Sequence, residues 1–350
     1  MSPRVFIAWL VVTVVTVVLA VVVGLGRETA TFDLVKREPV FETLRENPDA
    51  AAKIEVRSRF GEFTLERQEN RWVTPDRDGY PVDETDVRRL IVGLSDMRYV
   101  ERKTSNPERF TRLEVEDIDA GFSESAHVTV SGADGGALAD IIVGRPSARF
   151  FEGRASGTYI RVPDTTEVWL VSGVTNIQTR LVPWLDRQIV EIPANEVARI
   201  VIGEGEAGYV LERASADDAF AIEGAPEGRE PDAEKIRPVS RAFAGVDLED
   251  VKPRGEIQLP ADAAVAEIET FGGLNVRVRM AEIDRKRWAE FEARFTGNAS
   301  DDSDAAKSAR DAVTAINSRV GDWTYWVPSA FFSSLTRPVE EVLTEPENAS

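Results

Sequence analysis

An arginine-rich segment near the middle of the chain offers its most unusual local chemistry. The residues of interest, with a single acidic residue among them, are Arg145, Arg149, Phe150, Phe151, Arg154 and Arg161. The planar guanidinium group binds carboxylates and phosphates through paired hydrogen bonds, and arginines beside exposed aromatic side chains are typical of interaction hot spots. We therefore expect this segment to be a loop that binds a partner or an anionic ligand. The alternative is a surface loop whose arginines pair with neighbouring acidic side chains.

The carboxylates can be assigned to structural roles rather than to catalysis. Asp83 and Asp232 each precede a helical pattern, where an aspartate caps the free N–H groups of the first turn. The run Asp301, Asp302 and Asp304 could bind calcium, but it lacks the glycine and the terminal glutamate of a calcium-binding loop. We interpret it as an exposed loop, and expect neither a metal site nor a catalytic carboxylate pair.

Histidine and cysteine chemistry is almost absent from the sequence. The chain has no cysteine, which excludes disulfides, thiol nucleophiles and thiolate metal sites, and it has one histidine. That residue, His127, starts an alternating stretch typical of a β-strand. The glycines at 132–136 lack the spacing of a nucleotide-binding loop. We therefore predict that the protein is not an enzyme and that it uses no cofactor.

An uncharged apolar run, Val5 to Gly24, lies near the start of the sequence. About twenty residues at 1.5 Å each span about 30 Å, the thickness of a bilayer's hydrocarbon core. We expect a membrane anchor that includes Val5, Trp9, Leu19 and Gly24. The alternative is a cleaved secretory signal, but the run is longer than the apolar part of such signals and ends in a poor cleavage site.

The charges around this run bear on the side of the membrane that the body occupies. Lys and Arg residues lie on both sides of it, with Arg4 before it and Arg27, Lys36 and Arg37 after it, so their number alone does not favour an external body. A short positively charged tail resists translocation, whereas a long domain crosses largely regardless of its charge. We expect a membrane protein with a single span, a cytoplasmic N-terminus and an extracytoplasmic body.

The overall charge excludes one class of partner. The net charge is −19 and the pI is about 4.7. Such a chain repels phosphate backbones, so we expect no binding to nucleic acid. Membrane lipid, contacted through the N-terminal run, is the expected non-protein partner.

The part of the sequence after the apolar run contains two copies of one repeat unit. The matched positions, at one offset of 146, are Ile54 with Ile200, Phe63 with Tyr209, and Leu65-Glu66-Arg67 with Leu211-Glu212-Arg213. In both copies, alternating apolar residues lead into a glycine-containing turn and a second alternating run, which is typical of a β-hairpin. A helical pattern follows each hairpin, although Pro238 disturbs the second one, which could instead begin near that proline.

The sequence therefore predicts an α+β fold: one N-terminal transmembrane helix, then two tandem repeats of antiparallel β-sheet with packed helices. Further short helices are expected at 173–185 and 329–343, and a longer one at 305–320. The predicted divisions are a cytoplasmic tail and anchor (1–26), a juxtamembrane linker (27–52), repeat 1 (53–190), repeat 2 (191–337) with a charged insertion near 285–321, and an acidic tail (338–350).

Several short motifs resemble the bacterial family named domain of unknown function 4340. They are Arg71-Trp72-Val73, Pro81-Val82-Asp83, Gly157-Thr158-Tyr159-Ile160-Arg161, Val168-Trp169-Leu170-Val171 and Trp184-Leu185-Asp186-Arg187. The resemblance covers residues 50 to 190 well and the second half more weakly. It implies a single-pass protein of the bacterial inner membrane, with the body expected in the periplasm, often encoded beside ABC-type export permeases and components resembling gliding-motility auxiliary transporters. It implies no catalytic residues.

Together these observations favour a non-enzymatic, membrane-anchored accessory or scaffold protein of the cell envelope, partnered with an ABC-type permease or ATPase complex. The alternative is an extracytoplasmic module that binds an anionic envelope component through the arginine-rich segment. An envelope hydrolase would have to rely on His127 for any histidine-based mechanism.

Overall fold

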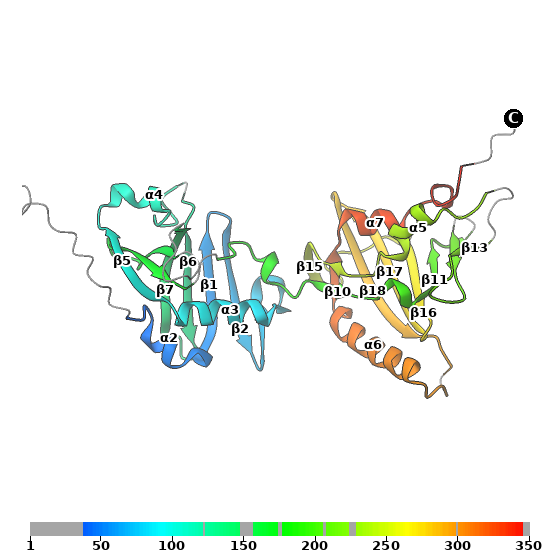
Figure 1. Cartoon of the computed structure of the whole chain (residues 1–350), viewed down its shortest axis with the longest axis horizontal. Coiled ribbons are helices and arrows are strands. Elements are labelled where there is room, and N and C mark those ends of the chain that lie inside the picture. The colour runs from blue at the N-terminus through cyan, green and yellow to red at the C-terminus, as the bar shows by residue number, and fades with distance from the viewer. Residues whose placement is uncertain are drawn as a thin grey trace, which may run out of the picture. The chain divides into compact units, whose positions relative to one another are not determined.

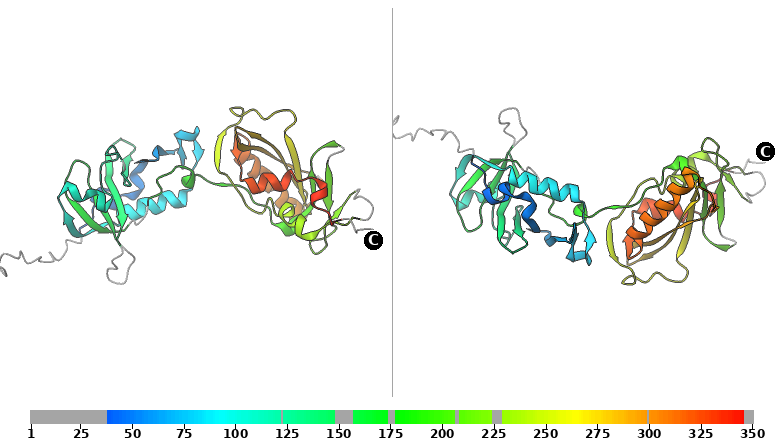
Figure 2. Two further views of the ribbon diagram at one scale, coloured as in Figure 1. Left: turned by 90° about the horizontal axis from the view of Figure 1, so that it is seen from above. Right: turned by 90° about the horizontal axis from the view of Figure 1, so that it is seen from below.

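The structure is a computed structural model that describes residues 38–121, 123–147, 157–173, 177–205, 208–223, 229–298 and 300–345. It divides into two compact units, each of which is discontinuous in sequence (Figures 1 and 2). The first unit comprises Met1–Thr64 and Thr85–Thr179, and the second comprises Leu65–Glu84 and Arg180–Ser350. The apolar run Val5 to Gly24 lies outside the described residues.

The larger of the two main sheets has nine strands, all from the first half of the chain. In chain order they are β1 (Ala51–Ser58), β2 (Gly61–Gln68), β3 (Arg71–Thr74), β4 (Tyr80–Pro81), β5 (Arg98–Thr104), β6 (Ala126–Gly132), β7 (Ala137–Pro146), β8 (Thr158–Arg161) and β9 (Val168–Ser172). Their order in the sheet is β4-β3-β2-β1-β6-β7-β8-β9-β5. All the pairings between these strands for which a register is defined are antiparallel.

The remaining strands belong to the second unit. They are β10 (Gln188–Val190), β11 (Val197–Ile202), β12 (Tyr209–Glu212), β13 (Ala221–Ile222), β14 (Val246–Asp247), β15 (Asp250–Pro253), β16 (Ala264–Thr270), β17 (Leu274–Ile283), β18 (Lys286–Phe295) and β19 (Trp323–Trp326). Eight of them form a sheet in the order β13-β12-β11-β16-β17-β18-β19-β15, and β10 pairs with β14. Apart from β4, the strand orders of the two large sheets correspond member by member.

Residues at the matched sequence positions also have matching environments. Ile54 and Ile200 are both fully buried, on β1 and β11. Phe63 of β2 and Tyr209 of β12 are each 5% exposed. The same alternation of inward and outward side chains therefore builds the same part of each sheet.

The helices are few, and most are short. They are α2 (Glu42–Glu46), α3 (Glu84–Ser95), α4 (Phe110–Leu113), α5 (Ala233–Ser240), α6 (Asp304–Val320) and α7 (Ser329–Leu335). Single 3-10 turns lie at Pro48–Ala50, Pro75–Arg77, Pro107–Arg109, Val182–Trp184, Ala194–Glu196 and Val339–Glu341. The most regular helical stripe belongs to α3, where Val87, Leu90, Ile91 and Leu94 are buried, as their spacing predicts.

The predicted α+β class is wrong, because the described part of the chain is mostly β-sheet with few helices. The segment near 285–321, interpreted from sequence as a charged insertion, contains the ten-residue strand β18. Its charged residues alternate with buried ones, such as Ala289, Phe291 and Ala293, so they occupy the outer face of a strand. The high charge of the segment obscures this alternation of exposed and buried residues in the sequence.

Prolines account for the helices that are shorter than expected. The stretch at 173–185 holds only a 3-10 turn that includes Pro183, and residues 174–176 lie outside the described part. The stretch at 329–343 holds α7, which ends before Pro338, and after that proline only the 3-10 turn Val339–Glu341. By contrast, α5 begins at Ala233 and accommodates Pro238 near its end, so it does not begin near that proline.

Within the described residues, no helix is long and apolar enough to cross a bilayer. The described part of the chain therefore does not support the transmembrane helix of the predicted fold. Residues Val5, Trp9, Leu19 and Gly24, on which that prediction rests, lie outside this part. At the other end, Val342 and Leu343 of the predicted acidic tail are buried in the second unit.

A side-chain amide completes the open edge of β18. Beyond Ala289, β18 has no paired residue on β19. Asn317 of α6 lies against this edge, accepts the Ala293 N–H at 2.8 Å and donates to the Ala293 carbonyl at 2.7 Å. The amide therefore replaces a strand at a place where α6 runs beside the sheet (Figure 1).

Candidate functional site

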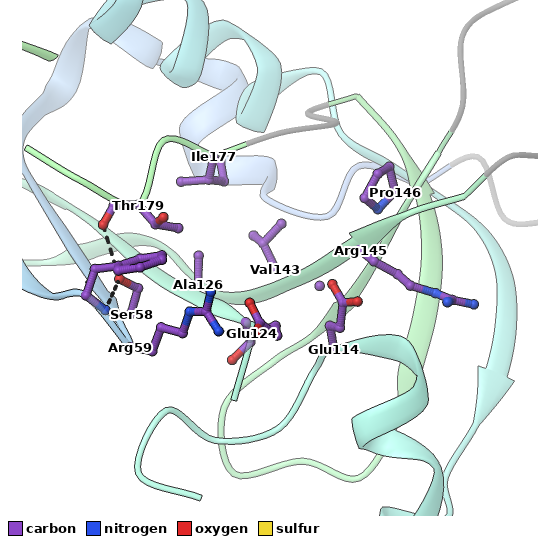
Figure 3. Close-up of a pocket in the computed structure, with 13 residues that line it drawn as sticks. Ser58, Arg59, Glu114, Glu124, Ala126, Val143, Arg145, Pro146, Ile177 and Thr179 are labelled. Carbon is purple, nitrogen blue, oxygen red and sulfur yellow. Dashed lines mark hydrogen bonds and ion pairs between the residues drawn. The ribbon is translucent and has the colours of Figure 1, made fainter. Parts of the chain in front are cut away.

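A surface cavity of about 210 Å³ in the first unit brings the most varied chemistry together (Figure 3). It lies where β1, β6 and β7 meet the segment 177–179. Its apolar wall consists of Ala126, Val143 and Ile177, all at least nine-tenths buried. The rest of the lining is mostly polar, so the cavity is a polar depression with a small apolar wall.

Two serine hydroxyl groups fix the wall of the cavity. Ser58 at the end of β1 donates to the Thr179 carbonyl at 3.1 Å, which ties the segment 177–179 to the sheet. Ser125 donates to the Glu116 carbonyl at 2.8 Å and lies 2.6 Å from the Ser123 hydroxyl. Because these hydroxyl groups are engaged with the protein's own backbone, we assign them to structure rather than to nucleophilic chemistry.

An exposed aromatic ring stands at the rim. Phe60 follows β1 in the tight turn before Gly61 and is 49% exposed, one of three exposed large apolar side chains, with Val92 and Phe271, among the described residues. The Arg59 guanidinium lies over the Phe60 ring at 4.7 Å, and Arg59 also forms an ion pair with Glu124. The arginine thus holds the ring at the mouth of the cavity.

Gly144 allows the opposite wall to form. A side chain at this position of β7 would place its Cβ 2.3 Å from the Leu113 carbonyl and 2.7 Å from the Glu114 carbonyl. The chain that follows α4 therefore packs directly on the backbone of β7. Glu114, which has a positive φ of 58°, lines the cavity as a result of this contact.

The structure separates the members of the predicted arginine-rich segment. Arg145 lines the cavity from β7 and is exposed, with its guanidinium extending away from Arg59 and Glu124 (Figure 3). Among the described residues it has no carboxylate within ion-pair distance. Arg149, Phe150, Phe151 and Arg154 lie outside the described residues.

Arg161 is a buried structural residue and not part of an accessible loop. It lies in β8, is 2% exposed, and donates to the Val115 carbonyl at 2.8 Å, the Thr165 carbonyl at 3.1 Å and Asp117 Oδ1 at 2.6 Å. Its guanidinium also lies 4.9 Å from the Phe110 ring centre. Arg161 therefore fastens the segment around α4 onto the sheet, which leaves its guanidinium engaged.

The aspartates and the histidine take structural positions. Asp232 caps α5 by accepting the Glu234 N–H, as predicted, and Asp83 directly precedes α3. His127 lies in β6 with its Nε2 at 2.6 Å from Asp140, and the Thr129 hydroxyl bonds to the same carboxylate rather than to the imidazole. This arrangement does not form a nucleophile–histidine–aspartate relay.

No metal-binding cluster occurs among the residues that the structure describes. In the run near 301, the Asp301 side chain accepts the Ser303 N–H at 2.9 Å, and the hydrogen bonds from Ser303 lower the pKa of that carboxyl. Ser303, in turn, caps α6. The acidic run therefore forms the N-terminal end of α6 and the turn that precedes it.

A second cavity, of about 380 Å³, lies in the second unit. It is lined by residues of the short motifs on which the family resemblance rests. Its floor is the buried pair Trp72 and Val82. Nearby, Tyr80 donates to the Asp186 carbonyl at 2.9 Å, and burial raises the pKa of Tyr80. The Tyr80 ring packs edge-on against Trp323 at 4.9 Å. These motifs therefore hold the segment Leu65–Glu84 in the second unit.

Sequence reasoning missed Arg59 and Phe60. The available signal was a large aromatic residue inside a hairpin turn, immediately before a glycine, where turn residues are usually small or polar. The apolar wall could not have been anticipated, because Ala126, Val143 and Ile177 come from separate parts of the chain.

The fold is that of an antiparallel β-sheet protein with two compact units. The chain belongs to the family described as Domain of unknown function (DUF4340), whose model matches residues 72–266. This match confirms the resemblance identified from the sequence motifs. No curated protein and no solved structure matches the chain.

Proposed function

We propose that this protein is a non-enzymatic accessory or scaffold protein of the bacterial cell envelope. The apolar run at 5–24 attaches it to the inner membrane, and its two β-sheet units lie in the periplasm. Its partner in this proposal is an ABC-type permease or ATPase complex.

The single observation that carries the proposal is the combination of the exposed Phe60 ring with the adjoining cavity. Exposure of an apolar ring to water is unfavourable, so a partner that covers Phe60, which is 49% exposed, together with the small apolar wall of the cavity gains free energy. The Arg59–Phe60 contact restricts the ring before binding, which lowers the entropy cost of association. The engaged hydroxyl groups, and the His127–Asp140 pair whose carboxylate also accepts from Thr129, support a binding role rather than a catalytic one.

A second candidate function is the binding of an anionic envelope component, and Arg145 favours it. This exposed arginine at the cavity rim has no ion-pair partner among the described residues. Inorganic phosphate and citrate are suitable probes. Either should raise the unfolding temperature of the wild type, and Arg145→Ala should abolish the effect; equal stabilisation of both proteins would exclude Arg145.

Co-purification tests the accessory function. The full-length chain, extracted in a mild detergent at native abundance, should recover a permease or ATPase subunit, and Phe60→Ser should lose it. Val92→Ser is the matched control, because Val92 is 46% exposed in α3, outside the cavity. Recovery of the chain alone, or recovery that is indifferent to Phe60→Ser, would contradict the proposal.

A further inference from the structure

The lining of the cavity in the first unit carries two charged side chains of opposite sign that are not used in ion pairs. Four charged residues line the cavity: Arg59, Glu114, Glu124 and Arg145. Arg59 and Glu124 pair with each other. Within the part of the chain that the structure describes, neither Glu114 nor Arg145 has an ion-pair partner. The lining therefore offers one positive and one negative group to a ligand.

These two charged residues lie at the same end of the cavity (Figure 3). The Glu114 carbonyl packs on the backbone of Gly144, where a Cβ would come within 2.7 Å of it, and Arg145 is the next residue of β7. Glu114 is also the C-cap of α4, in the left-handed conformation that such a cap requires. Both side chains therefore start from neighbouring backbone positions that the fold holds in place.

The second unit shows that the sheet does not require an arginine at position 145. The pairings of β1 with β6 and of β6 with β7 match those of β11 with β16 and of β16 with β17. On this match Val143 corresponds to Met280, and Arg145 corresponds to Glu282. Glu282 has the opposite charge and pairs with Arg287 of the next strand at 3.6 Å. The same strand position thus accepts either charge, and Arg145 is available to a ligand.

A ligand with a single charge fits this end of the cavity poorly. An anion attracted by Arg145 is repelled by the Glu114 carboxylate, and a cation attracted by Glu114 is repelled by the Arg145 guanidinium. A ligand with an ammonium and a carboxylate close together satisfies both groups. The buried wall of Ala126, Val143 and Ile177 adjoins them and is apolar. At about 210 Å³ the cavity is below the range of about 300–1,000 Å³ for drug-sized ligands, so its ligand is small.

We propose that this cavity binds a zwitterionic α-amino acid with an apolar side chain. The Arg145 guanidinium donates to the carboxylate of the ligand, the Glu114 carboxylate accepts from its ammonium, and its side chain lies against the apolar wall. The inference rests on the second candidate function, in which this cavity binds an envelope component through Arg145. It replaces a simple anion by a ligand that carries both charges.

Isothermal titration calorimetry of the full-length chain in detergent tests the class of ligand. L-Leucine should bind, whereas leucinamide, which lacks the carboxylate, and N-acetyl-leucine, which lacks the ammonium, should each bind at least about tenfold more weakly. Phosphoethanolamine, a zwitterion without an apolar side chain, should also bind more weakly than leucine. Binding of N-acetyl-leucine as tight as that of leucine would overturn the inference and leave the simple anion of the second candidate function standing. No binding of leucine, or tighter binding of phosphoethanolamine, would also overturn it.

Matched variants test the two contacts separately. Arg145→Ala and Glu114→Gln should each raise the Kd for leucine by about ten- to a hundredfold, the usual contribution of a hydrogen bond to a charged group. Arg145→Ala should not weaken leucinamide further, because that ligand lacks the carboxylate. The controls Arg112→Ala and Glu46→Gln change exposed residues of α4 and α2 outside the cavity lining and should leave the Kd unchanged. A wild-type Kd in Arg145→Ala or Glu114→Gln, or an equal loss of leucine and leucinamide in Arg145→Ala, would refute the assignment.

Discussion

Arg161→Met is the sharpest test of how the arginines of the first unit divide between structure and binding. Methionine keeps much of the apolar volume but removes three hydrogen bonds, one of them to the carbonyl of the fully buried Val115 and one to Asp117. Hydrogen bonds to charged groups contribute about 1.5–3 kcal/mol each, and losing one partner of a buried ion pair costs about 3–5 kcal/mol in total. Since Asp117 is exposed and regains water, its ion pair adds little, and we expect a loss of about 1.5–3 kcal/mol, mainly from the Val115 carbonyl left without its donor.

Hydrogen exchange with mass spectrometry locates this loss within the chain. Every 1.4 kcal/mol corresponds to a factor of ten, so peptides from α4 and β8 should lose about one to two orders of magnitude of protection. Peptides from β16 to β18 in the second unit provide an internal reference. The matched variant Arg145→Ala should change stability by less than about 0.5 kcal/mol, because Arg145 is exposed. Unchanged protection in Arg161→Met would refute the structural assignment.

Three further predictions concern individual contacts. Asn317→Ala should cost about 2–4 kcal/mol, because it leaves both backbone groups of Ala293 unpaired at the edge of β18; urea denaturation measures this, and no loss would contradict the edge-completing role. Gly144→Ala should destabilise the first unit by more than about 1 kcal/mol, because its Cβ would meet the Leu113 carbonyl at 2.3 Å; a wild-type unfolding temperature would exclude that contact. Tyr209→Phe should leave stability at pH 7 unchanged or raised, because the buried Tyr209 hydroxyl has no hydrogen-bond partner among the described residues; a loss above about 1 kcal/mol would reveal one.

Tyr209 also makes stability depend on pH. Burial raises the pKa of Tyr209 from its ordinary value of 10.0 to about 12. Between these two pKa values the folded state retains the Tyr209 proton that the unfolded state releases. The contribution of the neutral Tyr209 to the free energy of unfolding is therefore complete below pH 10 and is lost as the pH rises towards 12. Tyr209→Phe should reduce the slope of stability against pH in that interval, and an identical slope would contradict the assignment.

Local periodicity predicted some elements well because their signals are contained within a few residues. The buried stripe of α3 and the cap of α5 by Asp232 follow directly from spacing and residue type. The strand β18 was missed because its charges suggested an exposed insertion, although its period of two places them on one face.

The role of Arg161 could not be predicted from its own neighbourhood. Its burial depends on Phe110, Val115 and Asp117, which lie more than forty residues earlier and fold over β8. A local sequence pattern contains no information about such a cover. The candidate cavity was missed for the same reason, whereas the exposed Phe60 left a readable trace as an aromatic residue in a turn.

The position of the body relative to the membrane tests the central proposal most directly. A topology reporter fused after Ser350 of the full-length chain can be either alkaline phosphatase, active in the periplasm, or green fluorescent protein, fluorescent in the cytoplasm. If the body lies in the periplasm, the alkaline phosphatase fusion should be active and the green fluorescent protein fusion should not fluoresce. A fluorescent fusion with inactive phosphatase would contradict both the accessory function and the envelope-ligand alternative.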